Sequence, residues 1–205
     1  QMVLCMSVTQ KIKQTLNQYP HITFYLERGL INYRALARDV AKKLKLKNID
    51  AIATIINRIA KDYHYDSLAI RKIIAGSRIE LRSDVCVVTI YGSFQPTDVI
   101  CKVSTPEITT VIFDEKGADE FLQKLNPQKI VKIYRNMSLI SVISPPEIAD
   151  TSGVIAELLT LLASYDINII ELLSSHNYTL IVIPSEISIN AYKILHEFIQ
   201  NCRKL

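Results

Sequence analysis

Apolar residues recur at two different spacings along this chain, and the change of spacing divides it into two parts. Up to Gly76 the apolar positions follow the three- and four-residue intervals of amphipathic helices. From Arg78 onward, β-branched runs of strand length alternate with helical stretches. The pattern therefore predicts an α+β protein in which a helical domain, residues 1–76, precedes a mixed region.

Residues 1–76 are predicted to form a succession of short helices. Three of them cover Ser7–Tyr19, ended by Pro20, Ile22–Arg28, ended by Gly29, and Ser67–Ala75, ended by Gly76. A fourth helix starts after the N-cap Asn32 and has the inward stripe Tyr33, Leu36, Ala37, Val40, Ala41 and Leu44. A fifth starts at Asp50 and has the inward stripe Ile52, Ile55, Ile56, Ile59, Ala60 and Tyr63.

The helix that starts after Asn32 and the helix that starts at Asp50 are separated by the basic loop Lys45–Asn48. Together these two helices have the outline of a helix-turn-helix. The outer face of the helix that starts at Asp50 carries side chains that can contact bases or phosphates: Thr54, Asn57, Arg58 and Lys61. The helix that starts after Asn32 carries basic side chains that can contact a DNA backbone: Arg34, Arg38, Lys42 and Lys43. Binding of double-stranded DNA is one hypothesis for these eight residues, and an ordinary solvated helix face is the other.

The charge is unevenly distributed between the two parts. Residues 1–75 contain 13 basic and 5 acidic side chains, whereas residues 76–205 contain 11 basic and 15 acidic ones. This asymmetry indicates that the two parts have different partners.

The mixed region falls into two segments, 77–136 and 137–205. In the first, strands are predicted over Ile79–Tyr91, with an interruption near Ser83–Asp84, over Ile108–Phe113 and over Ile130–Tyr134, with a helix over Lys116–Leu125. In the second, the predicted order is strand, helix, strand, strand, helix, over Leu139–Ile143, Val154–Tyr165, Ile167–Leu173, Tyr178–Ile183 and Ile187–Cys202.

The stretch Ser138–Pro184 resembles an ACT domain, the βαββαβ module that regulates amino-acid metabolism, and most closely the ACT domains of aspartokinases. The resemblance rests on Ser141–Ser144 in the first strand, Asp150–Val154 at the loop-to-helix junction and Ile167–Glu171 in the second strand. Many family members have proline where this chain has Ser152, and serine suits a helix cap.

Aspartokinases pair two ACT units, and residues 77–136 look similar to a second, degenerate unit that lacks most of its first helix. The resemblance thus implies one complete and one degenerate ferredoxin-like βαββαβ unit, without the kinase portion. The whole chain resembles archaeal ACT-domain proteins that are predicted regulators of amino-acid metabolism. Exposed strand edges in such domains pair with another copy, which implies a homodimer.

The resemblance also implies a site for an amino acid or a related metabolite. Its expected residues are Asp150, Thr151, Ser152, Gly153 and Val154, with Asn168 and Ile169 from the next strand. The first N–H groups of a helix lack intrahelical partners and can receive a carboxylate. Asp150 is placed to meet an ammonium group, and Asn168 can add an amide. The alternative is that Asp150 and Thr151 only cap the helix.

No cluster of residues indicates catalysis, a metal or a cofactor. The four histidines are far apart, and the four cysteines, Cys5, Cys86, Cys101 and Cys202, form no C-x-x-C pair. No apolar run is long enough to span a membrane, and the first residues lack the basic start of a secretory signal. We therefore expect a cytoplasmic regulator without enzymatic activity. Two alternatives are an allosteric partner subunit of a biosynthetic enzyme and a ligand-free remnant of an aspartokinase regulatory region.

Overall fold

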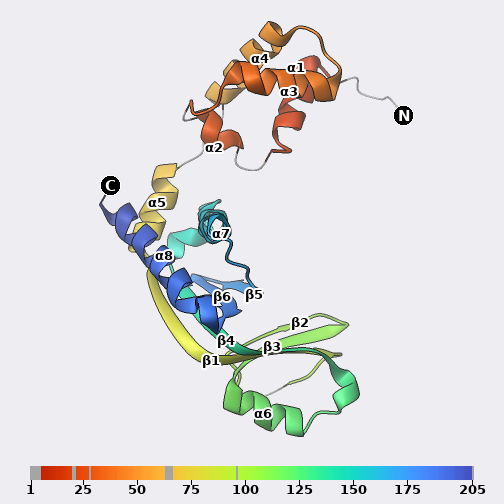
Figure 1. Cartoon of the computed structure of the whole chain (residues 1–205), viewed down its shortest axis with the longest axis vertical. Coiled ribbons are helices and arrows are strands. Elements are labelled where there is room, and N and C mark those ends of the chain that lie inside the picture. The colour runs from red at the N-terminus through yellow and green to blue at the C-terminus, as the bar shows by residue number, and fades with distance from the viewer. Residues whose placement is uncertain (1–5, 20–21, 28, 63–66, 96, 205) are drawn as a thin grey trace. The chain divides into compact units, whose positions relative to one another are not determined.

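The chain forms two compact units, residues 1–67 and 68–205, which are described separately (Figure 1). The structure is a computed structural model and describes residues 6–19, 22–27, 29–62, 67–95 and 97–204. Cys5, Pro20, Arg28 and Tyr63, which were named above, lie outside these ranges, as do two of the four histidines, His21 and His64. The division falls at Ser67, nine residues before the Gly76 boundary expected from the sequence.

The first unit is helical over its described residues. Its helices are α1 (Val8–Leu16), α2 (Ile22–Glu27), α3 (Tyr33–Leu44) and α4 (Ile49–Asp62). Their inward residues form one apolar core that includes Leu16, Leu26, Val40 and Ile56, each at most 1% exposed. Burial of this stripe, rather than helix propensity, stabilises helices of this length.

Side-chain caps fix where the helices of the first unit begin. Asn32 caps α3 by accepting a hydrogen bond from the Ala35 N–H, as predicted. The cap of α4 is Asn48, whose Oδ1 accepts from the Ala51 N–H at 3.0 Å. Our assignment of Asp50 as the start of α4 was therefore wrong: Asp50 lies within the first turn.

The second unit begins at the second residue of α5 (Ser67–Gly76) and continues into a six-stranded antiparallel sheet with three further α-helices. Its strands are β1 (Arg78–Tyr91), β2 (Cys101–Ser104), β3 (Ile108–Asp114), β4 (Ile130–Ile143), β5 (Glu171–Ser175) and β6 (Tyr178–Pro184). The helices are α6 (Glu115–Gln123), α7 (Val154–Ser164) and α8 (Ser185–Arg203). The strand order is β2-β3-β1-β4-β6-β5.

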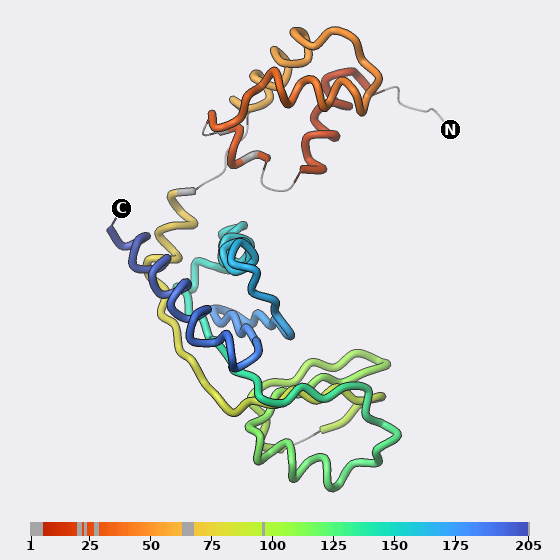
Figure 2. Tube along the Cα trace, viewed as in Figure 1, coloured from red at the N-terminus to blue at the C-terminus, as the bar shows by residue number. Residues whose placement is uncertain are grey.

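The two longest strands, β1 and β4, run through both halves of this sheet. The first half-sheet consists of β2, β3 and the paired segments 85–91 of β1 and 130–134 of β4. The second half-sheet consists of β5, β6 and the paired segments 78–82 of β1 and 137–143 of β4. Both long strands bend visibly where the halves meet (Figures 1 and 2).

The bend coincides with two residues in left-handed backbone conformation, Asp84 in β1 and Asn136 in β4, with φ values of 57° and 54°. Asp and Asn tolerate this conformation better than most residues. The register shifts between Arg82 and Val85, where β1 has one residue more than β4, and this extra residue forms a bulge, which increases local twist. The interruption predicted near Ser83–Asp84 is thus a bulge within one continuous strand.

Helices cover one face of the sheet. On the second half-sheet, α7 and α8 bury Leu158, Leu162 and Leu195 against Ile140 and Ile181. On the first half-sheet, the helix-side cluster contains Val88, Phe113 and Phe121. A separate cluster lies on the opposite face and joins both half-sheets, because Val85, Val87, Ile112, Leu139 and Val182 all belong to it.

Three strands differ from the sequence prediction. Two separate strands were predicted at Ile130–Tyr134 and Leu139–Ile143, and the structure joins them into the single strand β4. The structure places a strand at β2, which the sequence did not reveal. The β5 strand begins at Glu171 rather than Ile167, because Ile167 turns into the core beneath α7 and α8. The fold is thus mixed α+β, and residues 1–67 are helical over their described part.

Candidate functional site

The loop that connects β4 to α7 contains the five contiguous residues of the predicted ligand site. After β4 the chain forms a single 3-10 turn, Pro146–Ala149, and then reaches α7 through Asp150, Thr151 and Ser152. Asp150 and Ser152 are exposed, and Val154 is buried as the first residue of α7. The loop therefore presents polar groups to solvent directly at a helix N-terminus.

No side chain caps α7. Its N-cap is Gly153 in a left-handed conformation, φ 98°, without a side-chain hydrogen bond. The Thr151 hydroxyl donates backward to the Glu147 carbonyl at 2.9 Å, and the Glu157 N–H donates to the Gly153 carbonyl. The alternative that Asp150 and Thr151 serve as helix caps is therefore not what the structure shows.

The remaining two predicted residues, Asn168 and Ile169, lie at the other end of α7. Strands β4 and β5 are both antiparallel to β6 and so run in the same direction. Helix α7 must return across the sheet between them, and its 11 residues span about 16 Å. Within one chain the structure does not bring Asn168 to the Asp150–Gly153 loop.

The surroundings of Asn168 are those of an exposed turn beside an edge strand. Asn168 is exposed, and Ile169 packs on the core beneath α7 and α8. The Ile170 N–H donates to the Val182 carbonyl at 2.8 Å and so leads into β5. Burial raises the pKa of the Glu171 carboxyl at the start of this strand.

The start of the loop is anchored to neighbouring elements by short polar contacts. The Ser144 N–H donates to the Asn177 carbonyl, and the Asn177 amide donates back to the Ser144 carbonyl at 3.0 Å. The Ser77 hydroxyl, just after α5, donates to the Ser144 hydroxyl at 2.9 Å. A Cβ atom on Gly76 would lie 2.7 Å from Pro145, so only glycine fits there. The sequence analysis placed Gly76 at a helix end and Ser144 in a strand, but it did not predict these contacts.

Arg203 connects the end of α8 to the end of α5. Its Nε donates to the Ala75 carbonyl at 2.8 Å and its Nη2 to the Ser77 carbonyl at 2.9 Å. A cation at a helix C-terminus satisfies carbonyls that have no intrahelical partner. The end of α5 is thus fixed on the second unit beside the candidate loop.

The residues predicted to contact DNA lie on the exposed surfaces of α3 and α4. Arg34 forms an ion pair with Asp50 at 2.8 Å, and the Thr54 hydroxyl donates to the Asp50 carbonyl. Arg34 is thereby brought to the α4 face that carries Thr54, Asn57, Arg58 and Lys61, all exposed. Arg38 and Lys42 continue from Arg34 at four-residue intervals along α3 and are exposed as well.

Lys43 lies on a different side of α3 from Arg34. Its Nζ is 3.7 Å from Asp39 and 4.0 Å from the centroid of the Tyr19 ring. The hydrogen bond from the Tyr19 hydroxyl lowers the pKa of the Asp39 carboxyl, and the contact with Tyr19 raises the pKa of Lys43. Burial and the bond to Asp39 raise the pKa of Tyr19. Lys43 therefore already contacts Asp39 and Tyr19 within the helical unit.

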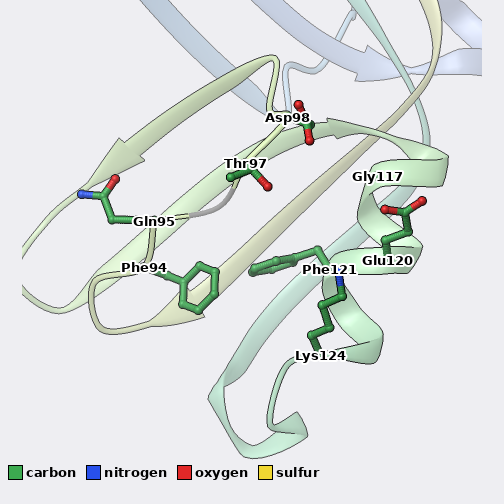
Figure 3. Close-up of a pocket in the computed structure, with 8 residues that line it drawn as sticks. All are labelled: Phe94, Gln95, Thr97, Asp98, Gly117, Glu120, Phe121 and Lys124. Atoms are coloured by element: carbon green, nitrogen blue, oxygen red, sulfur yellow. The ribbon is translucent and has the colours of Figure 1, made fainter.

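A separate pocket lies between α6 and the connection from β1 to β2 (Figure 3). The pocket is lined by Phe94 and Asp98 from the connection, by Gly117 and Phe121 of α6, and by Lys124 just after α6. The sequence analysis gave these residues no role, although the missing first helix of segment 77–136 was a signal that this part of the sheet would be less covered.

Among the described residues, no group of three or more histidine, cysteine, aspartate or glutamate side chains is placed to hold a metal ion. Cys86, Cys101 and Cys202 are free thiols. No helix of the described ranges combines the length and apolarity needed to cross a membrane.

A family model of the ACT domain matches residues 132–197, from within β4 to within α8. The second unit therefore contains an ACT domain, the regulatory module that the sequence resembled. The comparison with curated proteins gave no match.

Several solved structures are similar to part of this chain. Aspartate kinase from Synechocystis is 17% identical with a TM-score of 0.50, over 60% of this chain and 26% of that one. The regulatory subunit of aspartate kinase from Thermus flavus is 19% identical with a TM-score of 0.49, over 58% of this chain and 95% of that one. For the Clostridium acetobutylicum enzyme the identity is 16%, the TM-score 0.49 and the coverage 59% of this chain and 34% of that one. This chain thus spans about a third of the Clostridium kinase.

Proposed function

We propose that the protein is a regulator that senses an amino acid or a related small metabolite through its ACT domain. The observation that carries this proposal is the start of α7, where Gly153 provides no side-chain cap and Asp150 and Ser152 are exposed. The N–H groups at this end are suited to a carboxylate, and the helix dipole favours a negative charge there. Asp150 would then pair with the ligand's ammonium group.

A homodimer would complete the site. The β5 strand is an edge of the sheet, and an open edge pairs readily with another strand. If two copies pair antiparallel through β5, the start of each β5 lies beside the end of its counterpart. Asn168 of the partner subunit would then lie at the end of the sheet that carries the Asp150–Gly153 loop. Because Asn168 and the loop lie at opposite ends within one chain, this arrangement is the one in which both contact the same ligand.

An amino-acid ligand is expected to raise the unfolding temperature of the second unit. A ligand that binds only the native state at about 100 times its Kd stabilises it by about 2.7 kcal/mol. We would screen the twenty amino acids against the full chain by thermal denaturation and measure the affinity of any that bind by calorimetry. Asp150→Asn is expected to weaken binding about tenfold or more, because it removes the charge that faces the ammonium group.

The matched control is Asp166→Asn, the same change of charge in an exposed turn after the other end of α7. Asn tolerates the left-handed conformation of Asp166, φ 56°, so the control should fold and bind normally. No response to any amino acid, or equal loss of binding in both variants, would contradict the proposed site.

The effect of the ligand on the rest of the protein would be transmitted through α5. The end of α5 is fixed to the second unit by the contacts of Ser77 and Arg203, immediately beside the loop that leads to the ligand site. A ligand that favours one arrangement of this loop and of the dimer would thereby favour one arrangement of the two helical first units, each of which is joined to its second unit through α5. Such coupling requires only different ligand affinities in the two states.

Double-stranded DNA is the partner we propose for the helical unit, through a helix-turn-helix-like contact of α4. The exposed α4 face with Asn57, Arg58 and Lys61 favours it, and Arg34 adjoins this face. Lys43 is the weakest member of the predicted set, because it is engaged with Asp39 and Tyr19.

Fluorescence anisotropy with duplex DNA at several salt concentrations would test this partner. For the full chain we expect binding that weakens steeply with salt, and Lys61→Ala should reduce the slope of log K against log salt by about one. Lys193→Ala, an exposed lysine of α8, should leave affinity unchanged. Absence of binding at low salt would instead favour the second candidate, an allosteric partner subunit whose basic unit docks on an acidic protein surface.

A further inference from the structure

Helix α5 precedes the sheet in the chain and is attached to the second unit along one side. Its isoleucines Ile70, Ile73 and Ile74 are buried, at the three- and four-residue spacing of one helix face. The opposite side is open to solvent, because Leu68 is 77% exposed and Lys72 is exposed as well. A helix of ten residues is not stable by itself in water, so the order of α5 depends on this attachment.

The end of α5 is held by Arg203 from the end of α8, and the two helix ends lie side by side (Figures 1 and 2). The guanidinium of Arg203 donates to the Ala75 carbonyl at 2.8 Å and to the Ser77 carbonyl at 2.9 Å. Carbonyls at the end of a helix have no partner within the helix and need one from outside. Loss of this charged donor would therefore weaken the attachment of α5.

Directly after α5, buried hydroxyl groups connect the chain to the end of β4. Ser77 is 1% exposed, its hydroxyl donates to the Ile73 carbonyl, and its oxygen lies 2.9 Å from the Ser144 hydroxyl oxygen. Ser144 is 3% exposed and exchanges hydrogen bonds with Asn177 in the turn between β5 and β6. Because a buried polar group without a partner costs free energy, the attachment of α5 and the position of Ser144 depend on each other.

Pro145 extends this contact into the loop that leads to Asp150. A Cβ atom on Gly76 would lie 2.7 Å from Cγ of Pro145, so the backbone at the end of α5 packs directly on the proline ring. The Pro145 carbonyl accepts a hydrogen bond from the Ile148 N–H at 3.1 Å, and this bond begins the 3-10 turn Pro146–Ala149. Movement of α5 therefore displaces the residue on which the turn is built.

We propose that α5 is a docking helix with a docked and a released state, and that docking holds the β4–α7 loop in its present arrangement. Release breaks the two hydrogen bonds from Arg203 and uncovers Ser144 and the Pro145 ring together. The end of α5 and the loop therefore change state jointly, and such a shared two-state element is what couples distant sites.

This device specifies the regulation of the ligand site proposed above. Its use by a ligand rests on that proposed function, whereas the docking of α5 and its coupling to the loop exist without a ligand and are measured without one. A negative amino-acid screen would leave the docking of α5 unaffected, and a lack of coupling would leave ligand binding unaffected.

Hydrogen exchange of the full chain, followed by mass spectrometry, tests the two states. Arg203→Gln is expected to raise the exchange rates of the α5 amides about tenfold or more, because it removes a charged donor of two hydrogen bonds. Amides of the loop 146–153 should also exchange faster, whereas those of β3 and α6 should not change. Lys204→Gln, the same change of charge at the exposed next residue, is the matched control and should exchange as the wild type does.

Gly76→Ala tests the contact with Pro145 from the side of α5. Gly76 has no positive φ, and alanine favours a helix more than glycine does, so helix propensity alone would slow the exchange of α5. We expect faster exchange of α5 and of the loop instead, by about tenfold, because the added methyl group does not fit against the ring. The matched control is Gly117→Ala in α6, where a Cβ would meet Phe113 at an ordinary 3.6 Å and exchange should not rise.

Three results would overturn the proposal. Unchanged exchange of α5 in Arg203→Gln, or slower exchange in Gly76→Ala, would mean that these contacts do not hold the helix. Faster exchange of α5 without a change in the loop 146–153 would mean that the two are not coupled. Faster exchange throughout the sheet would mean that α5 opens only when the whole second unit unfolds.

Discussion

Phe113→Ala is expected to lower the free energy of unfolding of the second unit by about 3–5 kcal/mol. Phe113 is 1% exposed and is among the largest fully buried side chains of the chain. Its ring packs against that of Phe121 at a tilt of 31° with centroids 5.0 Å apart, and it lies 3.6 Å from where a Cβ on Gly117 would be. Truncation would leave a cavity between β3 and α6 that neighbouring side chains fill only in part. Urea denaturation followed by tyrosine fluorescence would measure the loss.

Phe94→Ala is the matched control, because the same ring is removed from the outer end of the same aromatic row. Its ring is 38% exposed, and its contact is a single edge-to-face pair with Phe121. We expect a cost of about 1 kcal/mol or less. A similar cost for both variants would mean that the row does not contribute to the core as the structure indicates.

Ile56→Ala is expected to unfold the first unit while the second stays folded. Ile56 is fully buried, all of its cluster belongs to residues of the first unit, and the substitution costs about 2–5 kcal/mol. A unit of 67 residues has a net stability of only a few kcal/mol, so this loss removes most of it.

Nuclear magnetic resonance spectra of the full chain would show the outcome of Ile56→Ala. Signals of the first unit should collapse to unfolded positions, and those of the sheet should remain dispersed. Ile55→Ala, a half-buried neighbour on the same helix, should leave the first unit folded. Loss of the sheet signals together with the helical ones would contradict the division into two separately stabilised units.

The elements with regular periodicity could be predicted from the sequence. The apolar stripes of α3, α4, α7 and α8 and the cap at Asn32 were evident, because burial of a helix face and local capping are encoded by neighbouring residues. The β2 strand, Cys101–Ser104, could not be found, because an edge strand of four residues with half-buried and exposed positions has no distinctive pattern. The start of β5 was misplaced because Ile167 is apolar for a different reason, its burial beneath α7 and α8.

For the candidate site, too, the sequence could predict the local features but not the contacts between distant residues. The Asp150–Gly153 loop is contiguous, so its position at a helix start follows from the local pattern. The distance of Asn168 from that loop depends on the directions of β4 and β5, which only the sheet pairing determines. The ion pair of Arg34 with Asp50 and the contact of Lys43 with Tyr19 join residues from different helices, and no spacing in the sequence indicates them.

The sharing of β1 and β4 between both half-sheets limits how this region can be divided by evolution or by the experimenter. The ACT match covers residues 132–197, yet the strand that pairs with its first strand is Arg78–Arg82, more than 50 residues earlier. A fragment restricted to the match would lose Leu81, the β1 partner of Ile140, and would expose the edge of β4. An exposed strand edge promotes aggregation. The smallest transferable module is therefore the whole second unit, and insertions are best tolerated in its loops rather than within β1 or β4.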